Sequence, residues 1–351
     1  MRSLTQVAKL AAAGDTVLLK AGTYDIANGE TFPRTPYDWN VPDDVTIQGE
    51  GWDATLLRGP DDANCETNSA LVLQGSARIR ALGVVAFCNG IRSSTKGVVE
   101  IQAVKIRGTQ TAVELSTNAT LDLMDISSSK TAINSSHGPL TIINSRVHEN
   151  RSGIHVDDSM PLVVTASEID HNCRGESPDE SQAILLKNEA TLTDVRVHDN
   201  ECPGIRVSAG GLTGPIVIAK SYFDENKPAA ITVDAAVRTT IRESHFFEHK
   251  QAIRLNGESN LDLGTPEEPG NNSFTVCDTC DAIFDARPAP AQGSNPITVK
   301  GISWTRGGDA LPVPMGCFDT DYPKGSTSPP RLWHIEHPGR CATATGNIIL
   351  N

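Results

Sequence analysis

A short phrase recurs along the chain at intervals of about 21 residues, and this recurrence constrains the fold more than any other feature. Each copy places a small residue before Ile or Val and then alternates polar and apolar residues, as in "SGIHV" at 152–156 and "PGIRV" at 203–207. The small residues of the successive copies are Gly90, Ala112, Ala132, Gly153, Ala183, Gly204, Ala230, Ala252 and Ala282. A nearly fixed period with occasional insertions is typical of a solenoid of stacked repeats.

Each copy also carries a second short apolar segment, such as "LTIINSRVHEN" at 140–150. These segments are too short and too rich in β-branched residues to be helices, so they predict strands. The Leu-x-x-Leu-x-Leu frame of a leucine-rich repeat is missing, and so is the 3.6-residue period of helical repeats. We therefore predict an all-β fold, a right-handed parallel β-helix with about three strands in each coil and a coil spacing of roughly 4.8 Å.

An asparagine stands at the turn before the repeated strand in several successive copies. Stacked amides can satisfy turn backbone groups that would otherwise be buried without partners, so we interpret this column as structural. Its members are Asn150, Asn172, Asn200 and Asn226.

The ends of a solenoid need covers, because the terminal coils would expose apolar faces and strand edges. "SLTQVAKLAAAGD" at 3–15 predicts a short capping helix, with Ser3 as N-cap and Leu4, Val7 and Leu10 on one face. We expect one continuous domain: an N-terminal cap and first coils at 1–60, β-helix coils at 61–285, and last coils with a disulfide-linked cap at 286–351.

Composition narrows the classes of function. The net charge of −13 argues against a nucleic-acid partner, because phosphate binding depends on basic surface. No run of 18 apolar residues is present, so we expect no membrane span. The first residues lack a separate hydrophobic region and a cleavage site, and we expect that any signal peptide is absent from this sequence.

The 8 cysteines favour disulfides and a secreted or cell-envelope location, with cytosolic free thiols as the alternative. Cys173 and Cys202 follow the turn asparagines of adjacent coils, so their Cα atoms should lie within bridging distance. Cys65 and Cys88 are one coil apart and can pair in the same way. The remaining four are expected to staple the C-terminal cap, although a redox motif or a four-cysteine zinc site stays open; they are Cys277, Cys280, Cys317 and Cys341.

The N-terminal stretch "AAAGDTVLLKAGTYDIANGETFPRTPYDWNVPDDVTIQGEG" and the closing segments "LDLGTPEEPGNNSF", "KGISW" and "GNIIL" resemble a bacterial domain family of unknown function. The chain also resembles the pectate-lyase-like superfamily of right-handed β-helices, and the resemblance covers most of the chain. It implies the fold and says little about chemistry. The sequence motifs of polygalacturonases, calcium-dependent pectate lyases and alginate epimerases are missing, so no catalytic residue carries over from them.

The repeat frame predicts an outward strip on the strand that follows each small residue, since successive side chains of a strand alternate between its faces. A lyase acting on a uronic acid needs a cation for the carboxylate and a base for the carbon-bound proton, and an inverting hydrolase needs two spaced carboxylates. We predict catalytic roles for His155, Asp157, Lys187 and Arg206. We predict substrate binding by Asp234, Arg254 and Asn256.

Plainer interpretations stay open for the strip and for the histidines near the asparagine turns. Mixed charges on a solvated face need no further reason. His148, His171 and His198 could suggest a metal column, but His171 is displaced by one position, so we expect a solvated turn and no metal site. Calcium remains a possible ligand of the acidic doublets Asp43-Asp44, Asp61-Asp62 and Asp157-Asp158.

The sequence thus predicts a secreted or envelope-associated protein that binds or cleaves a polysaccharide along this strip, either as a lyase or as a glycoside hydrolase. A non-enzymatic surface module or stiff spacer is the alternative. The sequence does not predict the oligomeric state.

Overall fold

The structure of the protein is a computed structural model, and the chain divides into two compact units, Met1–Glu168 and Ile169–Asn351. Described residues are 4, 7, 10–25, 39–59, 68–93, 96–157, 160–175, 181–208, 214–256, 259–265, 267–275, 280–286, 297–299, 302–306, 309–310, 331–335 and 348–350. Both units are built from parallel β-strands, with one antiparallel pair near the C-terminal end.

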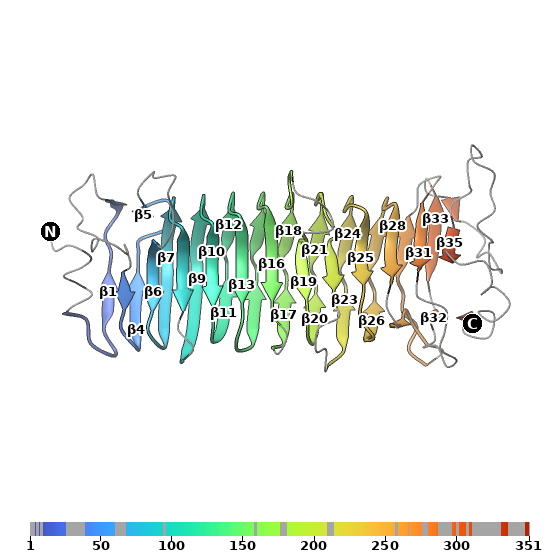
Figure 1. The fold of residues 1–351 in the computed structure, drawn as a ribbon, viewed down its shortest axis with the longest axis horizontal. Helices are drawn as coiled ribbons and strands as arrows, with labels where there is room; N and C mark the ends of the chain where they lie inside the picture. Colours follow the sequence, from blue (N-terminus) through green and yellow to red (C-terminus); the bar gives the residue numbers. More distant parts are fainter. Residues whose placement is uncertain are drawn as a thin grey trace. The chain divides into compact units, whose positions relative to one another are not determined.

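The first unit winds as a parallel β-helix in which sheet A takes two strands from a coil and sheet B takes one (Figure 1). Its sheet A strands are β1 (Thr16–Leu18), β2 (Gly22–Tyr24), β4 (Val45–Gln48), β5 (Thr55–Arg58), β7 (Ala77–Val85), β9 (Val98–Arg107), β11 (Asn118–Asp122), β12 (Asp125–Ser127), β14 (Leu140–Ile143), β15 (Arg146–His148) and β17 (Leu162–Thr165). Its sheet B strands are β3 (Asn40–Val41), β6 (Ser69–Leu73), β8 (Asn89–Ser93), β10 (Thr111–Leu115), β13 (Thr131–Ser135) and β16 (Ser152–Val156).

The second unit repeats this arrangement. After β18 (Glu168–Asp170), its sheet A strands are β20 (Ala190–Thr193), β21 (Arg196–His198), β23 (Ile216–Ala219), β24 (Tyr222–Asp224), β26 (Arg238–Arg242), β27 (His245–Phe247), β29 (Asn260–Asp262), β30 (Ser273–Thr275), β32 (Ile297–Val299), β33 (Ser303–Arg306), β34 (Asp309–Ala310) and β36 (Ile348–Leu350). Its sheet B strands are β19 (Ile184–Leu186), β22 (Ile205–Val207), β25 (Ala229–Val233), β28 (Gln251–Leu255), β31 (Asp281–Asp285) and β35 (Arg331–Ile335).

The repeated Ile or Val of the sequence phrase stacks in register inside each unit, as predicted. In the first unit Val113 pairs with Ile91 and with Ile133, and all three are buried. In the second unit Ile205 pairs with Ile184 and with Ile231. The residue after each of these positions therefore points outward, which fixes the face that the strip occupies.

A single residue in the left-handed region makes the corner between the two sheet A strands of a coil. Ala103 (φ 52°) interrupts β9, and Leu123 (φ 54°) separates β11 from β12. A second such corner, as at Glu149 (φ 56°), precedes the turn into sheet B. Glycine and asparagine are the residues that usually indicate a left-handed conformation, and few of these corners carry either. The positions of the corners therefore could not be predicted from residue type.

The asparagine column is structural, as predicted. In the second unit the Asn172 amide donates to Oδ1 of Asn200 (3.0 Å), and the Asn200 amide donates to Oδ1 of Asn226 (2.7 Å) and to the carbonyl of Ile169 (3.1 Å). All three asparagines are at most 2% exposed. The ladder thereby satisfies turn backbone that is closed off from water.

Aromatic residues fill the core beside this ladder. Phe246 stacks between Phe223 and Phe274, with ring centroids 4.9 and 4.8 Å apart and planes within 6°. The three rings lie on the parallel strands β24, β27 and β30, so the coil spacing imposes the stack.

The disulfide between Cys173 and Cys202 is confirmed, with Cα atoms 5.7 Å apart. Cys88 and Cys280 are also disulfide-bonded, which leaves no Cys280 thiolate for the four-cysteine zinc alternative. The other four cysteines lie outside the described residues, so the predicted Cys65–Cys88 pair and the pairing within the C-terminal cap stay predictions. These four are Cys65, Cys277, Cys317 and Cys341.

The expected N-terminal capping helix stays a prediction. Leu4 is buried and the amide of Ala11 donates to the carbonyl of Val7 over 2.9 Å, the spacing of a helical bond. Most of the segment around them lies outside the described residues.

Candidate functional site

The predicted strip forms two outward columns on sheet B of the second unit. Arg206 pairs in register with Leu185 and with Thr232, and Thr232 pairs with Arg254. The second column lies two residues further along each strand, where the amide of Asp234 donates to the Val207 carbonyl and that of Asn256 to the Val233 carbonyl. Arg206, Asp234, Arg254 and Asn256 therefore share one face, as the repeat frame predicts.

Hydrogen bonds link these four side chains into one network. Arg206 Nε donates to Asp234 Oδ2 (2.6 Å), and Asn256 Nδ2 donates to Asp234 Oδ1 (2.7 Å). Asn256 Oδ1 accepts from Arg254 Nε (2.8 Å). Asp234 uses both carboxylate oxygens in this way, so its role is to orient its neighbours.

Arg254 is held differently from Arg206. Its guanidinium carbon lies 5.3 Å from the centroid of the Phe284 ring, and its Nε contacts the neutral amide of Asn256. Within the part of the chain that the structure describes, these contacts give Arg254 no carboxylate partner, whereas Arg206 is paired with Asp234. Arg254 consequently presents a positioned positive charge that no described carboxylate pairs with.

Phe284 was not predicted as a site residue. It follows Ala282-Ile283, the last copy of the repeated phrase, and pairs in register with Arg254. The same frame that identified Arg254 would have identified Phe284 had it been extended by one coil.

The four predicted catalytic residues are divided between the units. Lys187 and Arg206 belong to the second unit, where Lys187 follows β19 and is half-buried. His155 and Asp157 belong to the first unit, with His155 Nε2 and Asp157 Oδ1 3.5 Å apart. The second unit alone therefore offers two cations, and the first offers an imidazole beside a carboxylate.

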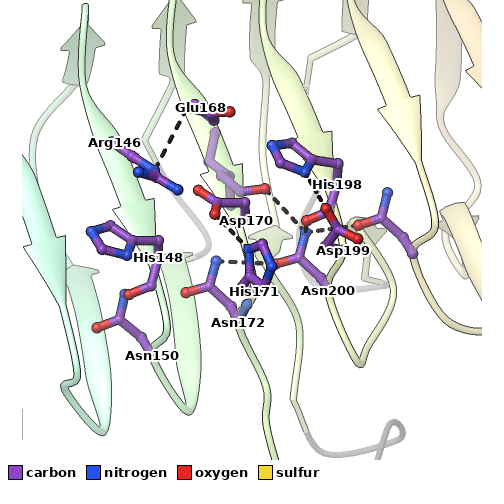
Figure 2. Close-up of polar contacts among 12 residues, drawn as sticks. Arg146, His148, Asn150, Glu168, Asp170, His171, Asn172, His198, Asp199 and Asn200 are labelled. Atoms are coloured by element: carbon purple, nitrogen blue, oxygen red, sulfur yellow. Dashed lines mark hydrogen bonds and ion pairs between the residues drawn. The ribbon is translucent and has the colours of Figure 1, made fainter.

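A second polar cluster of the second unit lies at the turns that follow β18 and β21 (Figure 2). Asp170 Oδ2 is 2.7 Å from His171 Nδ1, and Asp199 Oδ2 is 2.6 Å from His198 Nδ1. The two imidazole rings meet edge to face with centroids 6.1 Å apart. Each histidine thus has a carboxylate that fixes its ring orientation.

The expectation of a solvated turn is wrong for His198 and the adjoining Asp170, but it holds for His171, whose side chain is 37% exposed. Asp170 is fully buried and His198 is 6% exposed. A buried carboxylate such as that of Asp170 needs a hydrogen-bonding partner of the kind that His171 provides.

Asp224 extends the cluster by one coil, since it pairs in register with His198. Its Oδ1 is buried and has no hydrogen-bond partner. Burial raises the pKa of Asp224 above its usual value, and the nearby Glu225 and Asp199 carboxylates raise it further. Asp224 therefore takes up a proton more readily than an exposed aspartate.

One of the acidic doublets considered for calcium already serves the fold. Asp43 Oδ1 accepts a hydrogen bond from the Ser76 amide over 2.6 Å. Asp44 Oδ1 lies 3.8 Å from Arg78 Nη1. Asp61, Asp62 and Asp158 lie outside the described residues.

Comparison with known proteins confirms the fold class. A family described as "Right handed beta helix region" matches residues 89–246. The fold is therefore a right-handed parallel β-helix, as the sequence predicted. No curated protein matches the chain.

Several solved structures share this fold. The A-module of mannuronan C-5 epimerase AlgE4 from Azotobacter vinelandii is 13% identical, with 86% of this chain and 89% of that chain covered and a TM-score of 0.48. DFA-IIIase from Arthrobacter chlorophenolicus A6 is 12% identical, with 82% and 83% covered and a TM-score of 0.50. The catalytic domain of Agl-KA is 11% identical, with 92% and 61% covered and a TM-score of 0.50. At such identities the likeness to the two structures with a TM-score of 0.50 bears on the fold alone.

Membrane-spanning helices are also absent from the residues that the structure describes. No helix there has the length and apolar character that crossing a bilayer requires.

Proposed function

We propose that the protein binds an acidic, uronic-acid-containing polysaccharide along the outward face of sheet B in its second unit. The binding residues are Arg206, Asp234, Arg254 and Asn256, with Phe284 beneath Arg254 and Lys187 near the start of the strip. The same face processes the polymer as well as holding it, with Lys187 as the base and Arg206 hydrogen-bonding the sugar carboxylate.

The Arg254 side chain carries this proposal. A guanidinium held by an amide and an aromatic ring keeps its outer N–H groups in a fixed fork, which matches a carboxylate. Positioning it beforehand lowers the entropy cost of binding. Arg254 stands out because the chain as a whole is strongly acidic, with a net charge of −13.

The remaining residues of the strip support the same ligand. Arg206 is 31% exposed and Asp234 is 19% exposed, so an incoming sugar can reach the guanidinium while Asp234 holds it from the side. Thr232 lies on the strand between those of Arg206 and Arg254 and pairs with both residues. The two arginines are therefore two coil spacings, or about 10 Å, apart along the face. Arg254 supplies the positive charge for an acidic ligand, and Arg206 adds a second guanidinium whose charge is shared with Asp234.

The Cys173–Cys202 disulfide supports a secreted or envelope location, because such bonds persist in oxidising compartments. Polysaccharides are available there. A parallel β-helix is also compatible with ligand binding, since the solved structure of DFA-IIIase, which has a similar fold, is a complex with GF2.

The experiment is a panel of uronic-acid polymers and neutral glycans tested for binding, unsaturated products and new reducing ends. We expect binding to at least one uronic-acid polymer and a loss of about tenfold or more in Arg206→Gln/Arg254→Gln. We expect Lys187→Ala to abolish the formation of unsaturated products and new reducing ends from the bound polymer. No binding to any acidic polymer would overturn the proposal and favour the spacer alternative.

A further inference from the structure

A small hollow lies on the first unit and is lined by none of the residues of the strip described above. It has a cavity volume of about 360 Å³. Its walls are mostly apolar and come from the loop before β5 and from the corners of β7 and β9. They are Gly51, Trp52, Asp53, Ala54, Ala81 and Ala103.

The hollow exists because two successive corners carry alanine. Ala81 and Ala103 have φ values of 53° and 52° and occupy equivalent corner positions on adjacent coils. The next coil has Leu123 at the same corner with φ 54°, and that side chain is 45% exposed. The backbone therefore accepts a larger residue here, and the small side chains leave the space open.

The Trp52 loop closes one side of the hollow. The Gly51 amide donates to the Ala81 carbonyl over 2.9 Å, which ties the loop to the corner. At Gly83 a Cβ atom would lie 2.4 Å from the Trp52 carbonyl oxygen. Glycine at position 83 thus lets the loop pack closely and keeps the half-buried Trp52 beside the alanine floor.

Two polar residues precede the alanine corners on the strands that lead into them, outside the lining of the hollow. Arg80 precedes Ala81, Gln102 precedes Ala103, and the two residues pair in register. Both side chains are held by neighbouring coils, since Arg80 Nη2 lies 3.7 Å from Glu100 Oε2 and Gln102 Nε2 donates to Asp122 Oδ2 over 2.9 Å. The exposed carboxylate of Asp53 adds an acceptor on the loop side.

We propose that this hollow binds one neutral sugar ring of a glycan. A pyranose has an apolar face of C–H groups that packs on the indole of Trp52 and on the alanine floor, and hydroxyl groups at its edge that donate to the Asp53 carboxylate. The volume lies at the lower end for small-molecule pockets and suits one ring. Asp53 disfavours a uronic acid here, so this site differs in its preferred sugar from the strip on the second unit.

The inference rests on the proposed function only for the class of ligand, a glycan. The residues involved are different and belong to the other unit. Each site can therefore fail without the other.

The test is a titration of the full chain with neutral tetrasaccharides of glucose, mannose and galactose. Tryptophan fluorescence and calorimetry measure the binding. Ala103→Leu fills the hollow with the residue that position 123 already carries in the same conformation. We expect at least one tetrasaccharide to shift the tryptophan emission, Ala103→Leu to weaken its binding about tenfold, and Arg254→Gln to leave it unchanged.

Failure of the inference is separable from failure of the proposed function. If no neutral tetrasaccharide binds, or if Ala103→Leu binds as tightly as the original chain, the hollow is not a sugar site. Loss of acidic-polymer binding in Arg254→Gln would still support the strip. Trp52→Phe, which keeps a ring in the loop, provides a second variant if Ala103→Leu does not fold.

Discussion

The side-chain amide of Asn200 donates to Oδ1 of Asn226 across 2.7 Å, and both side chains are almost completely buried. The same Asn200 amide group also donates to the carbonyls of Ile169 and His198. One side chain thus satisfies the backbone of its own turn and of the neighbouring coil. The stacking of coils in the second unit depends on this link.

Replacing Asn200 by alanine should destabilise the protein by roughly 2 to 5 kcal/mol. The change removes a side-chain donor from the buried carbonyls of Ile169 and His198, the second of which keeps the His171 backbone amide as a donor, and it removes the acceptor of the Asn172 amide. Thermal and urea unfolding measure the loss. Asn118→Ala, at an exposed position of β11, is the matched control and should unfold like the original chain; equal stability of both variants would contradict the structural role of the ladder.

His249 should make stability depend on pH. It occupies the ladder position after Asn226 and is 2% exposed, and burial lowers its pKa from 6.5 to about 4. Between pH 6.5 and 4 the unfolded chain binds a proton that the folded chain does not, so stability falls as the pH is lowered through this range, by on the order of 3 kcal/mol.

His249→Asn restores the ladder residue and removes this titration. The unfolding free energy of His249→Asn minus that of the original chain should therefore increase steadily from pH 7 to pH 4. His137→Asn alters an exposed histidine and serves as the control. A difference that stays constant with pH would show that His249 is not a buried neutral imidazole.

The Cys173–Cys202 disulfide should contribute roughly 3 to 4 kcal/mol, because it closes a loop with a sequence separation of 29 in the unfolded chain. The variant Cys173→Ala/Cys202→Ala should show this loss in unfolding experiments. Non-reducing peptide mapping should recover the 173–202 pair and test Cys65–Cys88 in the same run. If peptide mapping recovers no disulfide-linked peptide that contains Cys173 and Cys202, the result contradicts the coil register.

The repeated phrase was enough to predict the fold class, the register and the outward strip. Small residues before Ile or Val recur because every coil must turn into the same strand, so the spacing alone places Arg206 beside Thr232 and Thr232 beside Arg254. The Cys173–Cys202 pair followed from the same register. Long-range neighbours are predictable here because each coil repeats the path of the previous one.

The corners and the buried polar pairs were not predictable in this way. Ala103 and Leu123 adopt left-handed backbone conformations, which alanine and leucine rarely do, so the residue types do not predict these corners. The pairing of Asp170 with His171 depends on which side chains the neighbouring coil buries, and that depends on loop paths rather than on the period. The Trp52 hollow likewise arises from loop packing against two corners.

The most direct test of the proposed binding face compares two variants of the chain. The affinity of each variant for an acidic polysaccharide is measured and set against that of the original chain. Arg254→Gln removes the positioned charge, and Arg238→Gln removes an exposed arginine from sheet A of the same unit, where it pairs with Asp262 over 3.1 Å. Calorimetric titration at low and moderate salt should show that Arg254→Gln weakens binding about tenfold and reduces its salt dependence, while Arg238→Gln binds like the original chain. Equal affinities for Arg254→Gln and Arg238→Gln would contradict the assignment of this face as the binding site.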